Sequence, residues 1–246
     1  LFSVLLTSIF LQCAVNTLND YADFVKGTDT IENSDDPTDA SIIYNELNPK
    51  SARNVGVAFI ILAAVSGIYA IYIAGWIPVV FSAVGVAVLA SYSFSKFPLS
   101  YLPVGEVISG FVMGGIIPLA SYYVFTLQIE PMVIVYCIPT IISIGLIMMT
   151  NNISDIEKDH DAKRKTLPCI LNRDKTSVLL KSLIILSAIF VCTLVVVYFR
   201  NGSFLIPLMI GSIIMPFNRL SNGRFMPESR ILSMNSILSI HTRLNL

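Results

Sequence analysis

Four polar side chains recur at helical spacing directly after the apolar residues 1–15. They are Asn16, Asn19, Asp20 and Asp23, at positions i, i+3, i+4 and i+7. These positions fall on one face of an α-helix, so their side chains are expected to point the same way. Ionisable groups at the end of an apolar segment are costly unless a cation, a proton or a charged substrate offsets their desolvation. This face is therefore a candidate binding surface.

A second polar cluster with the same spacing follows the apolar residues 132–150. It holds Asn151 or Asn152 at its start, then Asp155 and Asp159 about one and two helical turns later. One such cluster alone is commonly a helix cap or a solvated loop. Two clusters with the same spacing favour a common function, in which two helix faces that carry oxygen donors face each other.

Oxygen ligands without neighbouring histidine or cysteine indicate Mg²⁺ or Ca²⁺ rather than zinc or copper. Mg²⁺ usually takes one or two protein carboxylates and completes its shell with water and phosphate, so two clusters predict more than one metal ion holding a phosphorylated ligand. Lys163, Arg164 and Lys165 follow the second cluster and supply positive charge for a leaving diphosphate. The residues alone predict a membrane enzyme that acts on a lipid diphosphate.

The composition is that of a membrane protein. Apolar residues make up 54% of the chain and charged residues 13%, whereas soluble domains are roughly 45–50% apolar. About seven stretches approach the ~20 residues that cross a bilayer as a helix. They are residues 1–18, 54–74, 77–95, 107–127, 132–150, 179–199 and 203–217. The expected fold class is all-α, a multi-span transmembrane helical bundle.

The expected domain organisation is a transmembrane domain over residues 1–218 and a tail over residues 219–246. The tail contains a weaker apolar run at residues 231–240, which fits either an incomplete further span or an interfacial helix. The chain starts inside an apolar run with no basic segment before it. We therefore interpret this start as a shortened span rather than a signal peptide.

Basic residues predict the orientation. If the connections alternate sides, residues 19–53, 96–106, 151–181 and 218–230 share one side and carry fourteen lysines and arginines, whereas the other side has only Arg200. The positive-inside rule makes the first side cytoplasmic. Both acid clusters lie there, so the expected protein is a multi-pass protein of the cell membrane whose site opens to the cytoplasm. No basic stretch has the pattern of a nucleic-acid-binding surface.

Other polar residues carry less chemistry. The acids Glu32, Asp35, Asp36, Asp39 and Glu46 are expected to belong to a solvated loop. The four cysteines have no spacing suited to zinc, and three of them lie inside apolar spans. We interpret them as small buried hydrophobic residues.

The two clusters resemble the paired aspartate-rich motifs of UbiA-type intramembrane prenyltransferases. The resemblance is carried by residues 19–30, which begin Asn-Asp-Tyr-Ala-Asp, and by residues 151–167, which begin Asn-Asn-Ile-Ser-Asp. The Gly-Glu pair at residues 105–106 and the Tyr-Tyr pair at residues 122–123 add weaker likenesses. Within the family, the chain looks most like the 1,4-dihydroxy-2-naphthoate prenyltransferases of menaquinone synthesis. The resemblance implies eight or nine spans, of which the first is expected to be missing here.

The resemblance also implies the role of each site residue. The implied metal ligands are Asn19, Asp23, Asp155 and Asp159. Asp29 is a further candidate ligand, because Gly27 stands where the family has a third acid; a backbone bend at Gly27 must then carry Asp29 back toward the helix face. The implied catalytic residues are Lys165, in the place of a diphosphate-contacting lysine, and Glu106, which orients the acceptor. The remaining candidates for substrate binding are Asn16, Asp20, Lys26, Tyr21, Asn152, Lys163, Arg164 and Tyr122.

The implied reaction is Mg²⁺-dependent transfer of a prenyl chain from an allylic prenyl diphosphate to an aromatic acceptor at the lipid bilayer. Loss of diphosphate leaves an allyl cation, which tyrosine faces can stabilise and an electron-rich ring carbon captures. The acceptor is expected to be 1,4-dihydroxy-2-naphthoate, with 4-hydroxybenzoate, homogentisate or a tetrapyrrole as alternatives.

Two other functions share some of these features. A CDP-alcohol phosphotransferase also uses acids at the membrane edge, but no Asp-Gly-x-x-Ala-Arg element precedes the second cluster. A cation transporter would place its acids near the middle of broken helices, whereas these acids gather on one side with basic neighbours. Metal-dependent diphosphate release would distinguish either enzyme from a transporter.

Overall fold

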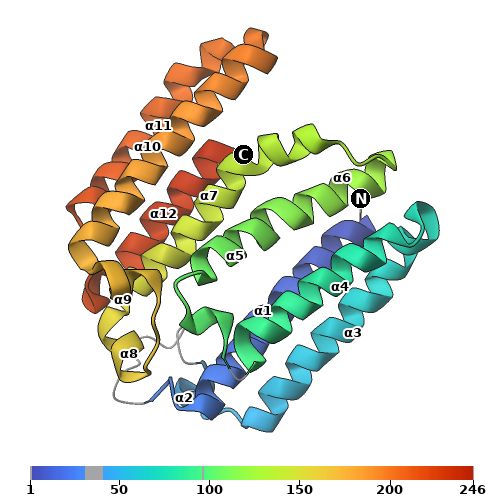
Figure 1. Ribbon diagram of the computed structural model, residues 1–246, viewed down its shortest axis with the longest axis vertical. Helices are drawn as coiled ribbons and strands as arrows, with labels where there is room; N and C mark the ends of the chain where they lie inside the picture. Colours follow the sequence, from blue (N-terminus) through green and yellow to red (C-terminus); the bar gives the residue numbers. More distant parts are fainter. Residues whose placement is uncertain (1, 31–40, 96, 246) are drawn as a thin grey trace. The chain divides into compact units, whose positions relative to one another are not determined.

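The computed structural model describes residues 2–30, 41–95 and 97–245 (Figure 1). Over these ranges the chain forms helices and no strands. Seven helical segments are long and apolar enough to cross a membrane. They are Phe2–Lys26, Pro49–Ala74, Ile77–Phe94, Gly105–Thr126, Pro131–Ser154, Arg173–Tyr198 and Arg200–Asn222. The expected all-α, multi-span class is confirmed. The loop acids Glu32, Asp35, Asp36 and Asp39 lie outside the described residues.

The chain divides into two compact units, which we describe separately. The first contains residues 1–100 and 119–129. Its elements are α1 (Phe2–Lys26), α2 (Ser41–Tyr44), α3 (Pro49–Ala74), α4 (Ile77–Leu89), the π-helical turn η1 (Ala90–Phe94), most of the 3₁₀ turn η2 (Leu99–Tyr101) and the later part of α6 (Ile117–Thr126). The helix α1, which carries the first acid cluster, packs along α3.

Small and polar residues let α1 and α3 approach closely. A Cβ added to Gly56 would stand 2.6 Å from Cγ of Leu18, so glycine makes room for this leucine. Nearer the start of α1, the hydroxyl groups of Thr7 and Ser66 lie 3.1 Å apart. Interhelical hydrogen bonds and small residues are the usual means of helix association in lipid. This packing fixes the helix that ends in the first cluster.

The second unit contains residues 101–118 and 130–246. Its elements are α5 (Gly105–Phe111), the π-helical turn η3 (Val112–Ile116), the start of α6, α7 (Pro131–Ser154), α8 (Ile156–Asp161), α9 (Leu167–Leu171), α10 (Arg173–Tyr198), the 3₁₀ turn η4 (Arg200–Leu205), α11 (Ile206–Asn222), the 3₁₀ turn η5 (Pro227–Ser229) and α12 (Arg230–Asn245). The helix α7 packs against α5, α10 and α12. The second acid cluster lies at its C-terminal end.

Gly110 of α5 and Gly114 of the following turn η3 bring their backbone into contact with that of α7. A Cβ at Gly110 would stand 2.4 Å from the backbone oxygen of Ile141, and one at Gly114 would stand 2.6 Å from the Ile141 nitrogen. From the α7 side, a Cβ added to Gly145 would stand 3.1 Å from the backbone oxygen of Glu106. This crossing holds Glu106, at the start of α5, against the last turns of α7.

The C-terminal residues form a helix that belongs to the second unit. Ile237, Ile240 and Leu244 of α12 are buried in the same apolar cluster as Leu180 of α10 and Ile153 of α7. The sequence left open whether this segment is an incomplete span or an interfacial helix; it is not among the seven candidate spans. The division into a domain ending at residue 218 and a separate tail stays a prediction.

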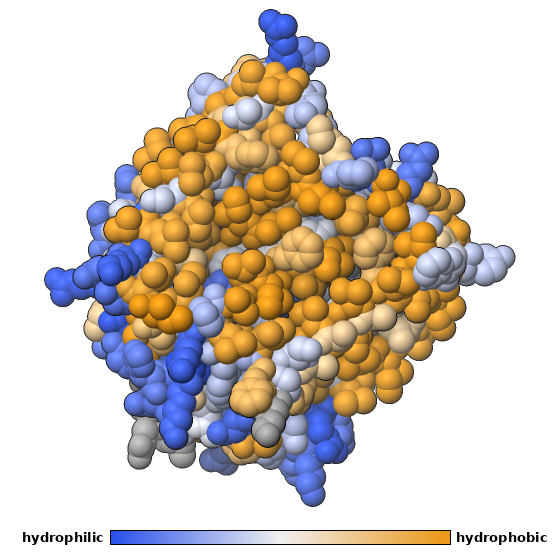
Figure 2. Space-filling view, viewed as in Figure 1, coloured by the Kyte–Doolittle hydropathy of each residue, from blue (hydrophilic) through white to orange (hydrophobic). Residues whose placement is uncertain are grey.

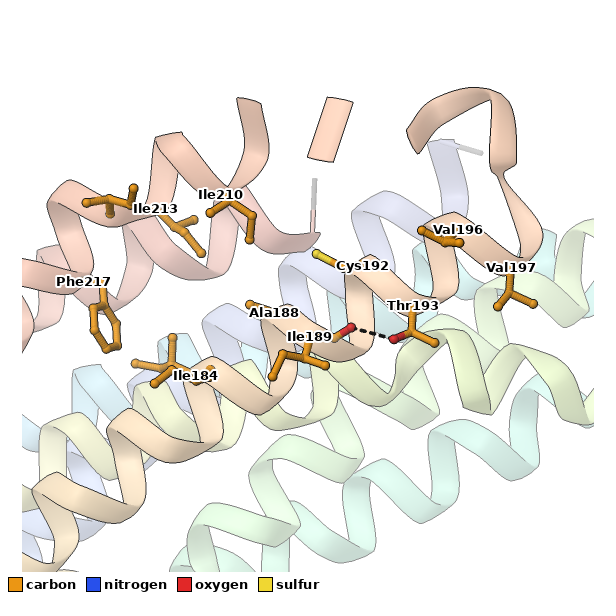
Figure 3. Close-up of a pocket in the computed structure, with 12 residues that line it drawn as sticks. Ile184, Ala188, Ile189, Cys192, Thr193, Val196, Val197, Ile210, Ile213 and Phe217 are labelled. Carbon is orange, nitrogen blue, oxygen red and sulfur yellow. Dashed lines mark hydrogen bonds between the residues drawn. The ribbon is translucent and has the colours of Figure 1, made fainter. Parts of the chain in front are cut away.

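The helices expose many large apolar side chains. Figure 2 shows hydrophobic side chains over most of the visible surface, as expected for helices that face lipid. An apolar groove of about 540 Å³ lies between α10 and α11, and its labelled lining residues include Ile189, Val196 and Phe217 (Figure 3). Because its lining side chains are almost entirely apolar, this groove offers no charge to a diphosphate and is not the candidate site.

Candidate active site

The first cluster is built around a hydrogen bond between Asn19 and Asp23 on α1. The Asn19 amide Nδ2 donates to Asp23 Oδ2 over 3.1 Å, and the Asn19 Oδ1 accepts from the Ser93 hydroxyl over 2.9 Å. Ser93 lies in the π-helical turn η1 and is 1% exposed. Lys26 donates to the backbone oxygen of the same serine. The amide is thus held with its NH₂ group toward the carboxylate.

The end of α1 turns back at Gly27, as the sequence predicts. Gly27 has a φ of +71°, a conformation that suits glycine. After it, the backbone nitrogen of Thr28 donates to the backbone oxygen of Asp23 over 2.9 Å. The backbone nitrogen of Asp29 lies 3.5 Å from the same oxygen. Asp29 is 8% exposed. The chain therefore bends at Gly27 and buries Asp29 beside the last turn of the helix, as a ligand role for Asp29 requires; that role itself stays a prediction.

The other residues expected near the first cluster differ in exposure. Asn16 is exposed and accepts a hydrogen bond from Gln12 over 3.0 Å. Asp20 and Tyr21 are half-buried, and so is Tyr122 on α6. Of the four polar residues predicted to share a face, the structure joins Asn19 and Asp23 by a direct hydrogen bond and gives Asn16 a partner one turn earlier.

The second cluster repeats the contact between an asparagine and an aspartate four residues later. The Asn151 amide Nδ2 lies 3.4 Å from Asp155 Oδ2, again four residues apart. The helix α7 ends at Ser154, and Asp155 stands at the junction with α8. Arg230, the first residue of α12, donates to the Asn151 Oδ1 from Nε over 3.1 Å and from Nη2 over 2.7 Å. Its Nη2 also lies 3.5 Å from Asp155 Oδ2.

Asp159 is deeply buried. It is 1% exposed; its Oδ2 accepts from the Thr166 hydroxyl over 2.9 Å, and its Oδ1 accepts from Arg164 over 3.4 Å. Burial raises the pKa of Asp159 above its ordinary value, while Arg164 and Thr166 act in the opposite direction. These contacts fold residues 159–166 into a compact loop at the end of the second cluster.

The three basic residues that follow do not act as one group. Lys163 and Lys165 have exposed side chains, whereas Arg164 is half-buried. The Arg164 guanidinium lies over the ring of Tyr101, 4.8 Å from its centroid. The backbone nitrogen of Lys165 donates to the backbone oxygen of Tyr101 over 2.8 Å. The two lysines can therefore reach an anion in solvent, while Arg164 holds the loop together.

Glu106 and Asn152 form a separate polar pair in the second unit. Asn152 Nδ2 donates to Glu106 Oε1 over 2.9 Å, and Glu106 is 2% exposed. Among the residues that the structure describes, none gives a hydrogen bond of ordinary geometry to the other carboxylate oxygen, Oε2, which is buried, although the backbone N–H groups of Glu106 and Leu167 lie near the carboxylate. A buried acceptor with no partner is costly unless a ligand satisfies it. The pair is therefore a candidate contact for a substrate hydroxyl.

The donor chemistry of the two clusters fits Mg²⁺. In the described parts of the chain, neither unit gathers three or more His, Cys, Asp or Glu side chains that could hold a metal ion alone. Each cluster instead offers carboxylate oxygens beside an amide, and Mg²⁺ usually takes only one or two protein carboxylates with the remainder from water and phosphate. Such a set suits a metal ion that arrives with a phosphorylated ligand.

The sequence family is established by comparison with known proteins. The model of the UbiA prenyltransferase family matches residues 1–224. The chain is 31% identical over 194 residues to the 1,4-dihydroxy-2-naphthoate octaprenyltransferase of Bacillus subtilis, covering 79% of this chain and 62% of that protein. The chain therefore belongs to the UbiA prenyltransferase family.

Two further relatives agree with this assignment. The 1,4-dihydroxy-2-naphthoate octaprenyltransferase of Haemophilus influenzae is 29% identical, covering 66% of this chain and 54% of that protein. The rat UbiA prenyltransferase domain-containing protein 1 is 28% identical, covering 72% of this chain and 55% of that protein. The chain thus spans between 54% and 62% of the length of these three relatives.

Several residues that shape the site were missed by the sequence reasoning. They are Ser93, Tyr101, Thr166 and Arg230, together with the glycines of the α5–α7 crossing. Only the glycines had a visible signal, since Gly110 and Gly114 are four residues apart in an apolar segment, a spacing typical of close helix contacts in membranes. Isolated serine, threonine and arginine residues far along the chain carry no such pattern.

Proposed function

We propose that this protein transfers a prenyl chain from an allylic prenyl diphosphate to an aromatic acceptor, with Mg²⁺ as cofactor. The observation that supports this most directly is the repeated Asn-x-x-x-Asp device. In each unit an amide is held by a donor from elsewhere in the chain and directs its NH₂ group to an aspartate. Such preorganised oxygen donors suit a metal–diphosphate ligand, and family membership supports the same conclusion.

The acids of both clusters are proposed to bind the metal–diphosphate group. Asn19, Asp23, Asp155 and Asp159 are the proposed ligands, with Asp29 as a further one. Bound Mg²⁺ would supply positive charge to the departing diphosphate. Lys165 and Lys163, whose side chains are exposed, would add charge at the same moment. The carbon–oxygen bond of the donor breaks with both electrons leaving on the diphosphate, so an allylic cation is left for the acceptor.

Glu106 is proposed to orient the acceptor. Its Oε1 is held by Asn152, which leaves the buried Oε2 available for a hydroxyl group of an aromatic ring. A hydroxyl that donates to this carboxylate raises the electron density of its ring, and the ring carbon then forms the new bond to the prenyl cation. With a hydroxynaphthoate acceptor, the new bond forms at the ring carbon that carries the carboxylate; the bond to the carboxylate then breaks, carbon dioxide leaves, and the electron pair of that bond restores the aromatic ring.

We propose 1,4-dihydroxy-2-naphthoate as the acceptor and menaquinone synthesis as the process, because two of the relatives are named for this substrate. The proposed orientation places both clusters at the cytoplasmic face of the cell membrane, following the distribution of basic residues. A water-soluble diphosphate head would then be accessible from the cytoplasm while its chain stays in the bilayer.

The test is a transfer assay in membranes that contain the full chain. Labelled prenyl diphosphate is supplied with 1,4-dihydroxy-2-naphthoate, 4-hydroxybenzoate or homogentisate, with Mg²⁺ or with EDTA. We expect a labelled product with the naphthoate and Mg²⁺ and none with EDTA. Transfer to another acceptor alone would replace the proposed substrate, and cation flux without diphosphate release would indicate a transporter instead.

A further inference from the structure

Arg230 reaches the second acid cluster from a part of the chain beyond the family match, which ends at residue 224. Its guanidinium contacts both Asn151 and Asp155, and its side chain is only 18% exposed. Asp155 is 14% exposed at its side chain. The contact is therefore partly buried and has two nitrogens on one oxygen, unlike an ordinary surface ion pair.

The contact decides which way the Asn151 amide faces. Arginine has only donors, so the amide group that meets it must be the oxygen. With Oδ1 bound by Nε and Nη2 of Arg230, the NH₂ group is left to face Asp155. The Asp155 carboxylate, which only accepts hydrogen bonds when ionised, favours the same orientation, so Arg230 and Asp155 hold the amide from its two sides.

The chain before α12 is built to place Arg230. Phe225 is 1% exposed and has a φ of +51°, a conformation that is strained for a bulky residue and persists only when its surroundings fix it. The turn η5 follows, closed by a hydrogen bond of 3.1 Å from the Met226 nitrogen to the Ser229 hydroxyl. From there α12 runs into the apolar cluster through Ile237 and Ile240.

We propose that Arg230 is a positioning residue of the metal–diphosphate site: it orients the Asn151 amide and holds Asp155 for its ligand. This inference rests on the proposed function. Residues that orient a metal ligand typically change metal affinity or activity by 10–100-fold when they are removed. The same role belongs to Ser93 in the first unit, where a neutral hydroxyl holds the corresponding asparagine.

The first test compares Arg230→Gln with Arg224→Gln, a matched control because Arg224 is exposed on the same connection. Manganese binding by the purified full chain is followed by electron paramagnetic resonance, and the Mg²⁺ dependence of prenyl transfer is measured alongside. We expect Arg230→Gln to weaken manganese binding and raise the Mg²⁺ requirement, each by about tenfold, and the control to stay within about twofold. Equal behaviour of the two variants would overturn the inference.

A double-mutant cycle separates positioning from general loss of structure. If Arg230 acts through Asn151, then Arg230→Gln should have little further effect on manganese binding once Asn151→Ala is present. Additive losses would show that Arg230 does not act through the Asn151 amide and would contradict that part of the proposal. Arg230→Lys keeps the charge but not the paired donors, so we expect an affinity between that of the wild type and that of Arg230→Gln.

The wild-type protein distinguishes a missing role of Arg230 from a different function of the whole site. A wild-type protein that transfers prenyl groups while Arg230→Gln matches the control refutes the role of Arg230 alone. A wild-type protein that neither binds manganese nor transfers prenyl groups refutes both, because the positioned site is then no metal site.

Discussion

Replacement of Gly110 by alanine tests how the structure holds Glu106. The added methyl group would stand 2.4 Å from the backbone oxygen of Ile141 and 3.2 Å from the nitrogen of Gly145, whereas ordinary contacts start near 3.4 Å. Both obstructing atoms are backbone, so no side-chain rotation relieves the clash. The helices α5 and α7 must separate by about 1 Å, and the Glu106–Asn152 hydrogen bond of 2.9 Å crosses that same interface.

The expected cost follows from two opposing effects. Overpacking of a well-packed interface costs about 1–3 kcal/mol, and we take the upper value because the clash is between backbones. Alanine is the better helix former by about 1 kcal/mol. The free energy of unfolding should therefore fall by about 2 kcal/mol. Gly211→Ala is the matched control in the same unit: no atom lies within 4 Å of its added methyl group, so only the favourable change remains.

The measurement is reversible unfolding of the purified chain in mixed micelles, with prenyl transfer as a second readout. We expect Gly110→Ala to be less stable than the wild type and to lose activity, and Gly211→Ala to be as stable as the wild type or more so. A Gly110→Ala protein as stable as the control, with unchanged transfer, would refute the close backbone crossing.

Three further predictions address the site and its sidedness. Ser93→Ala removes the hydroxyl that holds Asn19, so the Mg²⁺ requirement of prenyl transfer should rise about tenfold. The control Ser91→Ala loses an exposed hydroxyl that is bonded within its own helix and should behave as the wild type. Equal effects of the two variants would contradict the role of Ser93. Asp29→Asn should also raise the Mg²⁺ requirement if the bend makes this acid a ligand, and an unchanged requirement would leave it a structural acid of the turn. In a cysteine-free background, Gly202→Cys should react with an impermeant thiol reagent from outside the cell and Asp161→Cys only after the cytoplasmic face is exposed; the opposite pattern would reverse the predicted topology.

The elements of the fold were predictable because lipid imposes a simple rule on the sequence. Every spanning helix needs about 20 apolar residues, and the predicted stretches correspond to the seven candidate spans. The bend after α1 was predictable for a similarly local reason, since Gly27 interrupts the acid spacing. Packing was not predictable: the close approach at Gly110 depends on which helix lies opposite, and α12 depends on contacts with α7 and α11 that its own weak apolar pattern does not show.

The candidate site was predictable where one helix turn carries it. The Asn19–Asp23 and Asn151–Asp155 pairs follow from spacing alone. Ser93 and Arg230, which donate hydrogen bonds to the two asparagines, lie 74 and 79 residues away in sequence. No local pattern therefore predicts them. The different exposure of Arg164 and its two lysine neighbours was also not predictable, because Arg164 turns inward to contact Tyr101 and Asp159.

Both acid clusters are proposed to act on one metal–diphosphate substrate. The most direct measurement is transfer from labelled prenyl diphosphate by Asp23→Ala and Asp155→Ala in membranes with equal protein levels, beside wild-type membranes with Mg²⁺ and with EDTA. Each variant should lose nearly all transfer, as should wild type in EDTA, while circular dichroism of the purified variants shows an unchanged helical fold. Transfer within a few-fold of wild type in either variant would contradict the claim.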